Sequence, residues 1–431
     1  MTRLCLLSGD GASGKAGRNV QIITTDDFIL FGTRVARMFA YGLLSVVLGL
    51  YLSELGFNAL IIGGLLSLTL IGDSLISLMM TTTADRFGRR RILILGASLM
   101  LFAGTLFAFT TSLPLLLIAA IVGVVSPSGH EVGPFLAVEQ AALSQTLPDN
   151  RRTSIFGWYN LAGSLATALG ALTGGGLSGI LQKLGMTSVN SYRAVVLVYA
   201  AIGVILMLMF MRISSVIEAP TPNSTPLQTR FGLHRSRGIV FKLCSLFGLD
   251  AFAGGFVMQS IVAYWFHIRF GVEPTTLGAI FFGANILAAI SALAAARVAA
   301  RIGLVNTMVF THLPSNVLLM LVPLMPNLSL AIGVFLLRFS ISQMDVPTRQ
   351  SYTIAVVASD ERSAAAGVTG IARTVGASLS PALAGLLMSN PALMATPFFV
   401  AGTLKVVYDL LLYGNFRALR APEEHCLTKG R

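Results

Sequence analysis

The stretch TTTADRFGRRR, Thr81–Arg91, decides how the rest of the chain is interpreted. Five of its eleven residues are charged, although charged residues make up only 11% of the 431-residue chain. Two long apolar runs, residues 59–80 and 92–110, flank it. Each run is long enough to cross the roughly 30 Å hydrocarbon core of a bilayer as an α-helix. The stretch is therefore predicted to be a short polar loop between two membrane-spanning helices.

The whole chain has the composition of a membrane protein. It is 55% hydrophobic with a mean hydropathy of +0.78, whereas soluble domains carry about a quarter charged residues. Long apolar runs recur, and the alternating segments typical of a membrane β-barrel are absent. We predict an all-α integral membrane protein with twelve transmembrane helices, at residues 28–52, 59–81, 91–111, 114–143, 154–181, 193–213, 239–266, 274–299, 304–325, 328–357, 362–389 and 394–416.

The basic residues are distributed unevenly about these spans. Of the 30 Lys and Arg residues, 21 fall on the side that holds both termini. Only Lys183, Arg193 and Arg269 fall on the other side, and the rest lie inside spans. The positive-inside rule then places both termini in the cytoplasm of a multi-pass cell-membrane protein. The net charge of +12 reports topology, so no nucleic-acid partner is expected.

A weak internal repeat divides the chain into two halves. RMFAYG (Arg37–Gly42) aligns with DAFAGG (Asp250–Gly255) at an offset of 213 residues, and DRFG (Asp85–Gly88) aligns with ARIG at 215. A duplicated six-plus-six bundle with a site between its halves is typical of secondary transporters. The predicted organisation is a cytoplasmic tail (1–27), a six-helix bundle (28–213), a linker (214–238), a second bundle (239–416) and a tail (417–431).

ADRFGRRR resembles the cytoplasmic signature between helices 2 and 3 of the major facilitator superfamily, G-x-x-x-D-R-x-G-R-R. Asp85, Arg86, Gly88, Arg89 and Arg90 match, and Thr81 replaces the first glycine. The resemblance implies a twelve-helix transporter of two pseudo-symmetric bundles, in which this cluster latches the halves together in the outward-open state. Glycine permits a tight turn with positive φ. Ordinary positive-inside arginines would explain Arg89–Arg91, but neither Asp85 nor Gly88.

Two further patterns bear on that family. GALTGG is similar to its antiporter motif G-P-x-x-G-G, which favours export, although ordinary small-residue helix packing is an alternative. The matching span of the second half, SPALAG, restores the missing proline. The residues concerned are Gly170, Gly174, Gly175 and Pro381. The family's helix 4 arginine, linked to proton coupling, is missing here, and Arg338 lies at the corresponding place in the second half.

Ionisable residues inside membrane spans are costly and mark functional sites by default. Candidates for substrate or proton binding are Asp73, His130, Glu131, Arg338 and Asp345. The segment SPSGHEVGP breaks the fourth span and places His130 and Glu131 near mid-depth, which is tolerated only against protein or a cavity. A buried carboxylate can change protonation near neutral pH, as a proton-coupled carrier requires. Satisfied internal ion pairs are the alternative.

Two pairs of opposite charges occupy equivalent positions in the two halves. Arg37 matches Asp250 on helices 1 and 7, and Glu139 matches Arg349 on helices 4 and 10. We predict that these pairs bridge the cytoplasmic half of the cleft as gates, with substrate contacts as the alternative. Arg373 and the pair Lys405 and Asp409 are interpreted as packing pairs.

The predicted function is transport of a small organic solute, coupled to protons and directed outward. A facilitator or importer of a polar or anionic metabolite is the alternative, favoured by Arg34, Arg338 and Arg349. A membrane-embedded lipid-modifying enzyme would need a nucleophile–base pair or a metal triad, and no such pattern occurs. We expect no catalytic activity, no cofactor and no bound metal. The expected partners are the solute, protons and the lipid bilayer, and a monomer is expected.

Overall fold

The structure is a computed structural model that describes residues 25–131, 133–146, 149–214, 217–218, 235–358 and 361–417. Every regular element in these residues is helical. The predicted terminal tails and most of the predicted linker (residues 1–24, 219–234 and 418–431) lie outside the described residues. The side chain of Asp85 also lies outside them.

The helices follow the predicted spans closely. The first half holds α1 Thr25–Glu54, α2 Ala59–Phe87, α3 Arg89–Phe109, α4 Leu113–Val122, α5 Phe135–Thr146, α6 Asp149–Lys183 and α7 Ser188–Met211. The second half holds α8 Arg237–Gly255, α9 Gln259–Phe270, α10 Pro274–Ile302, α11 Leu304–Leu321, η3 Val322–Leu324, α12 Leu328–Ser342, α13 Asp345–Val356, α14 Arg362–Met388, η5 Pro391–Leu393 and α15 Thr396–Phe416.

The lengths and composition of these helices confirm a protein that crosses a membrane many times. Within the described residues, eleven helical segments are long and apolar enough to span a bilayer, and α4 is a shorter apolar helix. Together with α5, α4 makes up the predicted fourth span. The twelve-span arrangement is thus confirmed.

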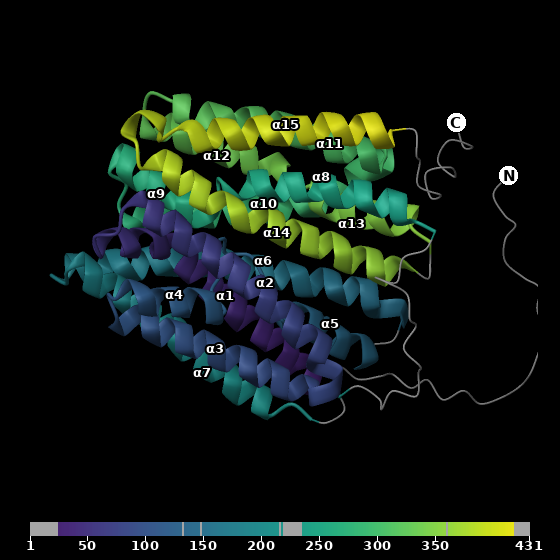
Figure 1. Cartoon of the computed structure of the whole chain (residues 1–431), viewed down its shortest axis with the longest axis horizontal. Helices are drawn as coiled ribbons and strands as arrows, with labels where there is room; N and C mark the ends of the chain where they lie inside the picture. Colours follow the sequence, from purple (N-terminus) through teal and green to yellow (C-terminus); the bar gives the residue numbers. More distant parts are fainter. Residues whose placement is uncertain are drawn as a thin grey trace, which may run out of the picture.

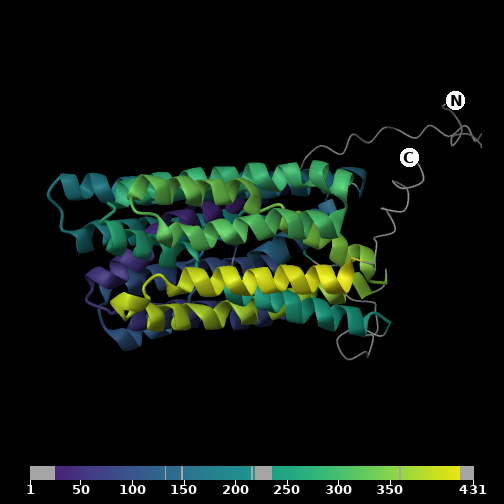
Figure 2. The same cartoon turned by 90° about the horizontal axis from the view of Figure 1, so that it is seen from above.

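The helices form two bundles that lie side by side (Figure 1). α1–α7 make up one bundle and α8–α15 the other, and most helices run along the long axis of the molecule, as the second view also shows (Figure 2). α1 begins and α15 ends toward the same end of the molecule (Figure 1). We call it the termini end, and we call the opposite one the far end. The even number of spans explains this placement, since each pair of crossings returns the chain to its starting side.

The fourth span is broken where its sequence predicts a break. α4 ends at Val122 and α5 begins at Phe135. The connection needs positive φ angles, +71° at Gly129 and +80° at Gly133, which favour glycine. The Pro127 carbonyl, which no helix satisfies, accepts a 2.6 Å hydrogen bond from the Ser260 hydroxyl of the other bundle.

The seventh and tenth predicted spans, 239–266 and 328–357, are also broken, and each consists of two helices. α8 ends at Gly255, and the hydroxyl oxygen of Ser380 on α14 lies so close that a Cβ atom on Gly255 would be 2.1 Å from it. A glycine there lets the two backbones approach. α12 ends at Ser342, and the backbone N–H of Gln343 donates instead to the Ser291 hydroxyl at 3.3 Å. Packing against neighbouring helices therefore supplies partners for the interrupted backbone.

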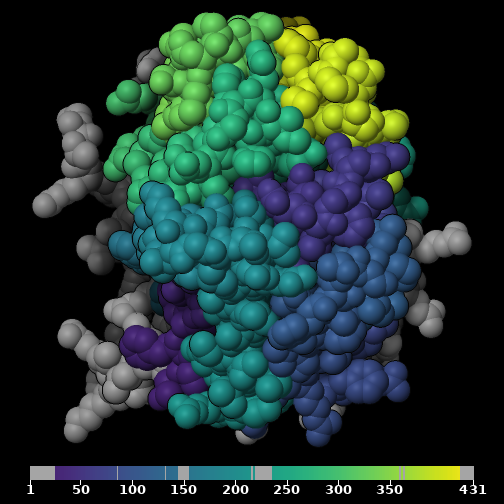
Figure 3. All heavy atoms as spheres, turned by 90° about the vertical axis from the view of Figure 1, so that its left-hand side faces the viewer, coloured from purple at the N-terminus to yellow at the C-terminus, as the bar shows by residue number. Residues whose placement is uncertain are grey.

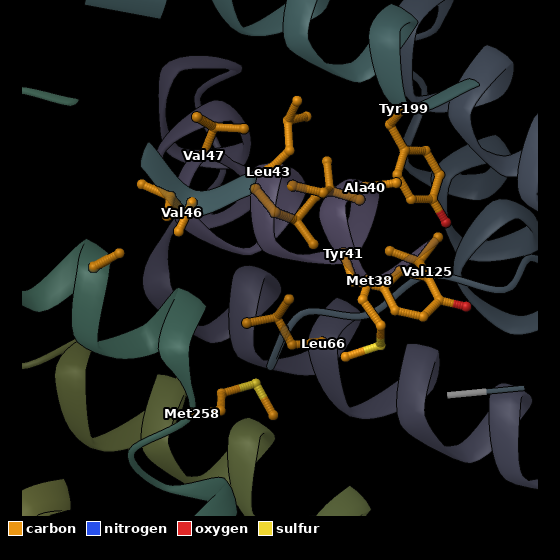
Figure 4. Close-up of a cluster of buried hydrophobic side chains, with 14 of the residues drawn as sticks. Met38, Ala40, Tyr41, Leu43, Val46, Val47, Leu66, Val125, Tyr199 and Met258 are labelled. Carbon is orange, nitrogen blue, oxygen red and sulfur yellow. The ribbon is translucent and has the colours of Figure 1, made fainter. Parts of the chain in front are cut away.

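α1 lies at the centre of the first bundle and is its most buried helix. From Ala40 to Leu52 every residue is buried. Figure 4 shows side chains of this helix, among them Tyr41 and Val46, beside Leu66 of α2 and Tyr199 of α7. The Tyr199 hydroxyl donates to the carbonyl of Val124 in the broken fourth span. The broken segment is thus held by the core and not by lipid.

The bundles meet most closely at the far end. There α6 packs on α10 and α14 packs on α2, in each case through glycines: a Cβ atom on Gly175 would lie 2.2 Å from the Pro274 carbonyl oxygen, and one on Gly63 would lie 2.3 Å from that of Pro381. Figure 3 shows this end, where atoms of the two bundles are packed against one another across the middle. Small residues therefore close the far end.

Candidate functional site

The first bundle contains a buried charge network around Arg37. Its guanidinium donates two parallel hydrogen bonds to Glu139, at 2.8 and 2.7 Å, and a third from Nε to Glu131 at 2.7 Å. Arg37 and Glu139 are both 0% exposed. A bidentate, charge-assisted pair of this kind is among the stronger hydrogen-bonding arrangements. α1 supplies the cation, α5 supplies Glu139, and the connection between α4 and α5 supplies Glu131.

Neighbouring side chains complete that network. Thr33 donates to Glu139 at 3.0 Å, and the Tyr159 hydroxyl of α6 also donates to it. Arg34 forms an ion pair with Glu131, and its guanidinium lies 4.6 Å from the centre of the Tyr159 ring. Glu131 is therefore held by two arginines one helical turn apart. The break in the fourth span brings this carboxylate to them.

Asp73 of α2 lies apart from these ion pairs. Its residue is 4% exposed, and its Oδ1 atom has no hydrogen-bond partner. The backbone of Gly133 hydrogen-bonds to the carboxyl group, and Glu131 is the nearby charge that acts on it. Within the part of the chain that the structure describes, no cation lies within ion-pair distance of Asp73. An unpaired charge is costly at such a place, and taking up a proton would remove it.

The second bundle contains its own network around Asp250. Arg349 donates to Asp250 at 3.1 Å and to Asp345 at 3.0 Å, and Lys405 of α15 pairs with the other oxygen of Asp250. The Arg373 guanidinium of α14 stands 3.9 Å from Asp250. The other members of this network, like Asp250, belong to the second bundle: Asp345, Arg349, Arg373 and Lys405. The predicted packing pair of Lys405 with Asp409 was wrong, because Lys405 turns to Asp250.

A histidine links Asp250 to a second carboxylate. His312 Nδ1 lies 2.9 Å from Asp409, and its Nε2 lies 4.0 Å from Asp250. Asn316, one turn further along α11, donates to Asp409 at 2.9 Å. Neither His312 nor Asn316 is among the residues predicted from the sequence. Their i, i+4 spacing on an apolar helix was the available signal, since two polar residues on one face of a buried helix require partners.

The predicted gate partners therefore pair within bundles and not across them. Arg37 pairs with Glu139, and Asp250 pairs with Arg349. In this conformation neither Arg37 nor Glu139 contacts its predicted mate of the other bundle. The same helix positions form the pair in both halves, with the charges exchanged. A gate across the axis in another conformation stays a prediction.

Among the predicted site residues, Arg338 and His130 form no ion pair or hydrogen bond with the side chains of these two networks. Arg338 makes no hydrogen bond or ion pair with any described residue, and its Nε atom is buried without a partner. Its guanidinium lies 4.9 Å from the centre of the Phe339 ring. His130 is exposed although it sits in the middle of a span, and the charge of Arg373 acts on its ring.

The predicted latch loop is tied to the end of its own bundle. Gly88 has φ +98°, as the tight turn requires, and Gly303 at the equivalent place has +90°. The Glu218 carboxylate accepts from the backbone N–H of Arg89 at 2.6 Å and of Arg90 at 3.3 Å. It thus binds the positive N-terminus of α3. Arg86 is exposed. A latch between halves, and the part of Asp85 in it, remain predictions.

The glycines of the antiporter-like stretch divide between two neighbours. Gly170 and Gly174 pack on α1, where added Cβ atoms would lie 2.0 Å from the Phe39 carbonyl and 2.3 Å from that of Leu43. Gly175 packs on α10 and Pro381 on α2, as described above. α6 thus approaches α1 of its own bundle and α10 of the other bundle closely. Whether the motif also sets a transport direction remains a prediction.

The sequence resembles known membrane proteins along most of its length. The family model "Major Facilitator Superfamily" matches residues 30–381. The uncharacterized membrane protein YJR124C of Saccharomyces cerevisiae is 29% identical over 436 residues, covering 94% of this chain and 96% of that protein.

Solved structures of transporters share the fold. The nucleoside transporter NupG superposes with a TM-score of 0.70 at 14% identity, covering 91% of this chain and all of that one. The D-xylose–proton symporter gives 0.68 at 13%, covering 90% and 96%. The human organic anion transporter MFSD10 gives 0.59 at 16%, covering 89% and 98%. With its two six-helix bundles and the match of residues 30–381 to the family model, the chain belongs to the major facilitator superfamily of secondary transporters.

Proposed function

We propose that this transporter exports a small organic solute across the cell membrane and that proton binding at Asp73 is coupled to the movement. Asp73 carries the proposal, because it is buried, lacks a countercharge among the described residues and leaves one carboxyl oxygen unbonded. The other carboxylates buried inside the described spans have cationic or polar partners. A proton can therefore come and go at Asp73 without breaking an ion pair.

Coupling then follows from linkage. If Asp73 is charged in one conformation and protonated in the other, protonation and solute binding both shift the equilibrium between inward-open and outward-open states. Asp73 lies on α2, whose far-end part packs against α14 of the other bundle. A change of charge on this helix is thus well placed to alter the contact between bundles. The D-xylose–proton symporter, which shares the fold, gives a precedent for proton coupling.

Export is the direction favoured by the similarity of residues 170–175 to the antiporter motif. With both termini in the cytoplasm, the closed far end faces outward and the described conformation is inward-facing. Uptake of a polar or anionic metabolite is the second candidate, and the unpaired guanidinium of Arg338 favours an anionic solute for it. The two candidates share the same proton site.

Flux in proteoliposomes tests the proposal. The purified chain is reconstituted, a panel of labelled solutes is screened by counterflow, and the hits are measured with and without a pH gradient. We expect a gradient to drive accumulation by the wild type. Asp73→Asn should keep counterflow but lose accumulation, whereas Glu54→Gln, at an exposed carboxylate at the end of α1, should keep both. Undiminished proton-driven accumulation by Asp73→Asn would refute the role of Asp73.

A further inference from the structure

Two arginines of the second bundle have no hydrogen-bonded carboxylate among the described residues. Arg338 of α12 makes no ion pair there, and Asp250 and Asp345 act on it only at longer range. Arg373 of α14 has an Nη1 atom without a hydrogen-bond partner, and its nearest carboxylate oxygen is 3.9 Å away. That carboxylate, Asp250, is already bound by Arg349 and Lys405. The described residues therefore satisfy neither guanidinium completely.

The charged residues inside the second bundle also include more cations than carboxylates. The described interior of its spans holds three carboxylates, which are Asp250, Asp345 and Asp409. It holds four permanent cations, which are Arg338, Arg349, Arg373 and Lys405. Without counting His312, the cations outnumber the carboxylates by one. An uncompensated charge at membrane depth is expensive, so a bound anion would supply what the protein leaves out.

His130 of the first bundle lies close to this excess positive charge of the second bundle. It belongs to the broken fourth span of the first bundle, yet the charge of Arg373 on α14 acts on it. His130 is exposed, and the Arg373 side chain is 37% exposed, although both lie well inside their spans. The backbone beside His130 reaches the second bundle directly, through the hydrogen bond from Ser260 to Pro127. The two side chains, one from each bundle, are thus accessible and near enough for the charge of Arg373 to act on His130.

We propose that Arg338 and Arg373 bind the carboxylate of the transported solute, with His130 facing it from the first bundle, so that the substrate is a small organic monocarboxylate. Guanidinium groups bind carboxylates through paired hydrogen bonds. One negative charge balances the excess in the second bundle. This inference rests on the proposed transport function and assigns the class of solute for that same site.

The experiment compares acids with their neutral amides. Purified full-length protein is tested by thermal shift with benzoate and lactate against benzamide and lactamide, and the same compounds, labelled, are tested by counterflow in proteoliposomes. We expect the carboxylates to raise the Tm and to exchange, and the amides to do neither. Equal effects of acid and amide, or an effect of inorganic phosphate with none of either acid, would overturn the assignment of a carboxylate.

Variants test the two arginines separately. Loss of one charge-assisted contact should weaken carboxylate binding by roughly 10- to 100-fold in Arg338→Gln and in Arg373→Gln. Arg373→Lys, which keeps the charge, should recover part of the affinity. Arg297→Gln, at an exposed arginine of α10, is the matched control and should bind as the wild type does. Unchanged affinity in both Gln variants would overturn the site.

These outcomes separate the inference from the function on which it rests. Proton-driven transport of neutral solutes without any preference for acids would remove the carboxylate site but leave the proposed function standing. Carboxylate binding with no flux in proteoliposomes would remove the proposed function while leaving the binding site. Folding of each variant is checked by its Tm without ligand, and the Arg373→Lys variant keeps the test decisive where a Gln variant fails to fold.

Discussion

Arg37 and Glu139 are joined by two parallel hydrogen bonds inside the first bundle, and Arg349 and Asp250, at the equivalent positions of the second, form the same pair with the charges exchanged. Each half therefore keeps an ion pair between its first and fourth helices, although the positive and negative residues have changed places between the halves. An ion pair needs opposite charges and not a particular order, so duplication followed by an exchange of sign keeps the helices attached. Each bundle thus has an internal brace between its first and fourth helices.

The brace in the first bundle should be important for stability. Glu139→Gln removes the charge that Arg37 faces and also weakens acceptance from Tyr159 and Thr33. Breaking a buried pair typically costs about 3–5 kcal/mol, and Glu131 should reduce this somewhat because it still binds Arg37. We expect a clearly lower Tm of the purified variant. An unchanged Tm, with Glu54→Gln as the surface control, would show that the pair contributes nothing to folding.

The overall organisation was predictable from sequence because bilayer thickness fixes the length of every span and charge bias fixes their alternation. The break at residues 123–134 was predictable too, since Pro127, Gly129, Gly133 and Pro134 all disfavour a continuous helix. The breaks near Phe256 and Gln343 lack such a density of signals and depend on contacts with distant helices. Local sequence does not encode those contacts.

The candidate site was predictable by residue but not by pairing. Each charge inside a span could be identified, because its cost in a membrane marks it. Its partner could not, because Arg37 reaches Glu139 across 102 residues of sequence and Lys405 reaches Asp250 across 155. Pseudo-symmetry indicates only which positions are equivalent in the two halves. Equivalence under a repeat does not imply contact, and the structure places both pairs within bundles.

The turn before α3 should tolerate no side chain. Gly88 has φ +98°, and an added Cβ atom would lie 3.3 Å from both carboxylate oxygens of Glu218. Placing alanine in a left-handed conformation costs about 1–2 kcal/mol, and here it also pushes against the carboxylate that binds the helix N-terminus. We expect Gly88→Ala to reduce flux at equal expression. Gly64→Ala, a helical glycine of α2 with open space at its Cβ position, is the control and should transport normally.

The direction of insertion can be measured independently of any substrate. Met186 and Leu324 lie at the far end and are 39% and 59% exposed. In a chain whose own cysteines are replaced by serine, a cysteine at either position should react with an impermeant thiol reagent added outside intact cells. Tags on both termini should be protected until the cells are permeabilised. The reverse pattern would place the termini outside and would make the described conformation outward-facing.

Two adjacent glycines of α6 offer the sharpest test of how the far end closes. Gly175 lies against α10, where an added Cβ atom would be 2.2 Å from the Pro274 carbonyl oxygen and 2.8 Å from the Cα of Gly278, whereas the Cβ position of Gly176 has nothing within 4 Å. Both substitutions to alanine raise helix propensity equally, by roughly 1 kcal/mol, so their difference isolates the contact between bundles.

Gly175→Ala should force α6 and α10 apart and weaken closure, because neither backbone atom can move aside cheaply. We expect this variant to lose flux and to expose a cysteine introduced at Thr275 to an impermeant reagent, while Gly176→Ala keeps wild-type flux and protection. Similar behaviour of the two variants would mean that the glycine contact does not control closure, and that the far end is held instead by hydrogen bonds such as those from Ser260 to Pro127 and to Ser45.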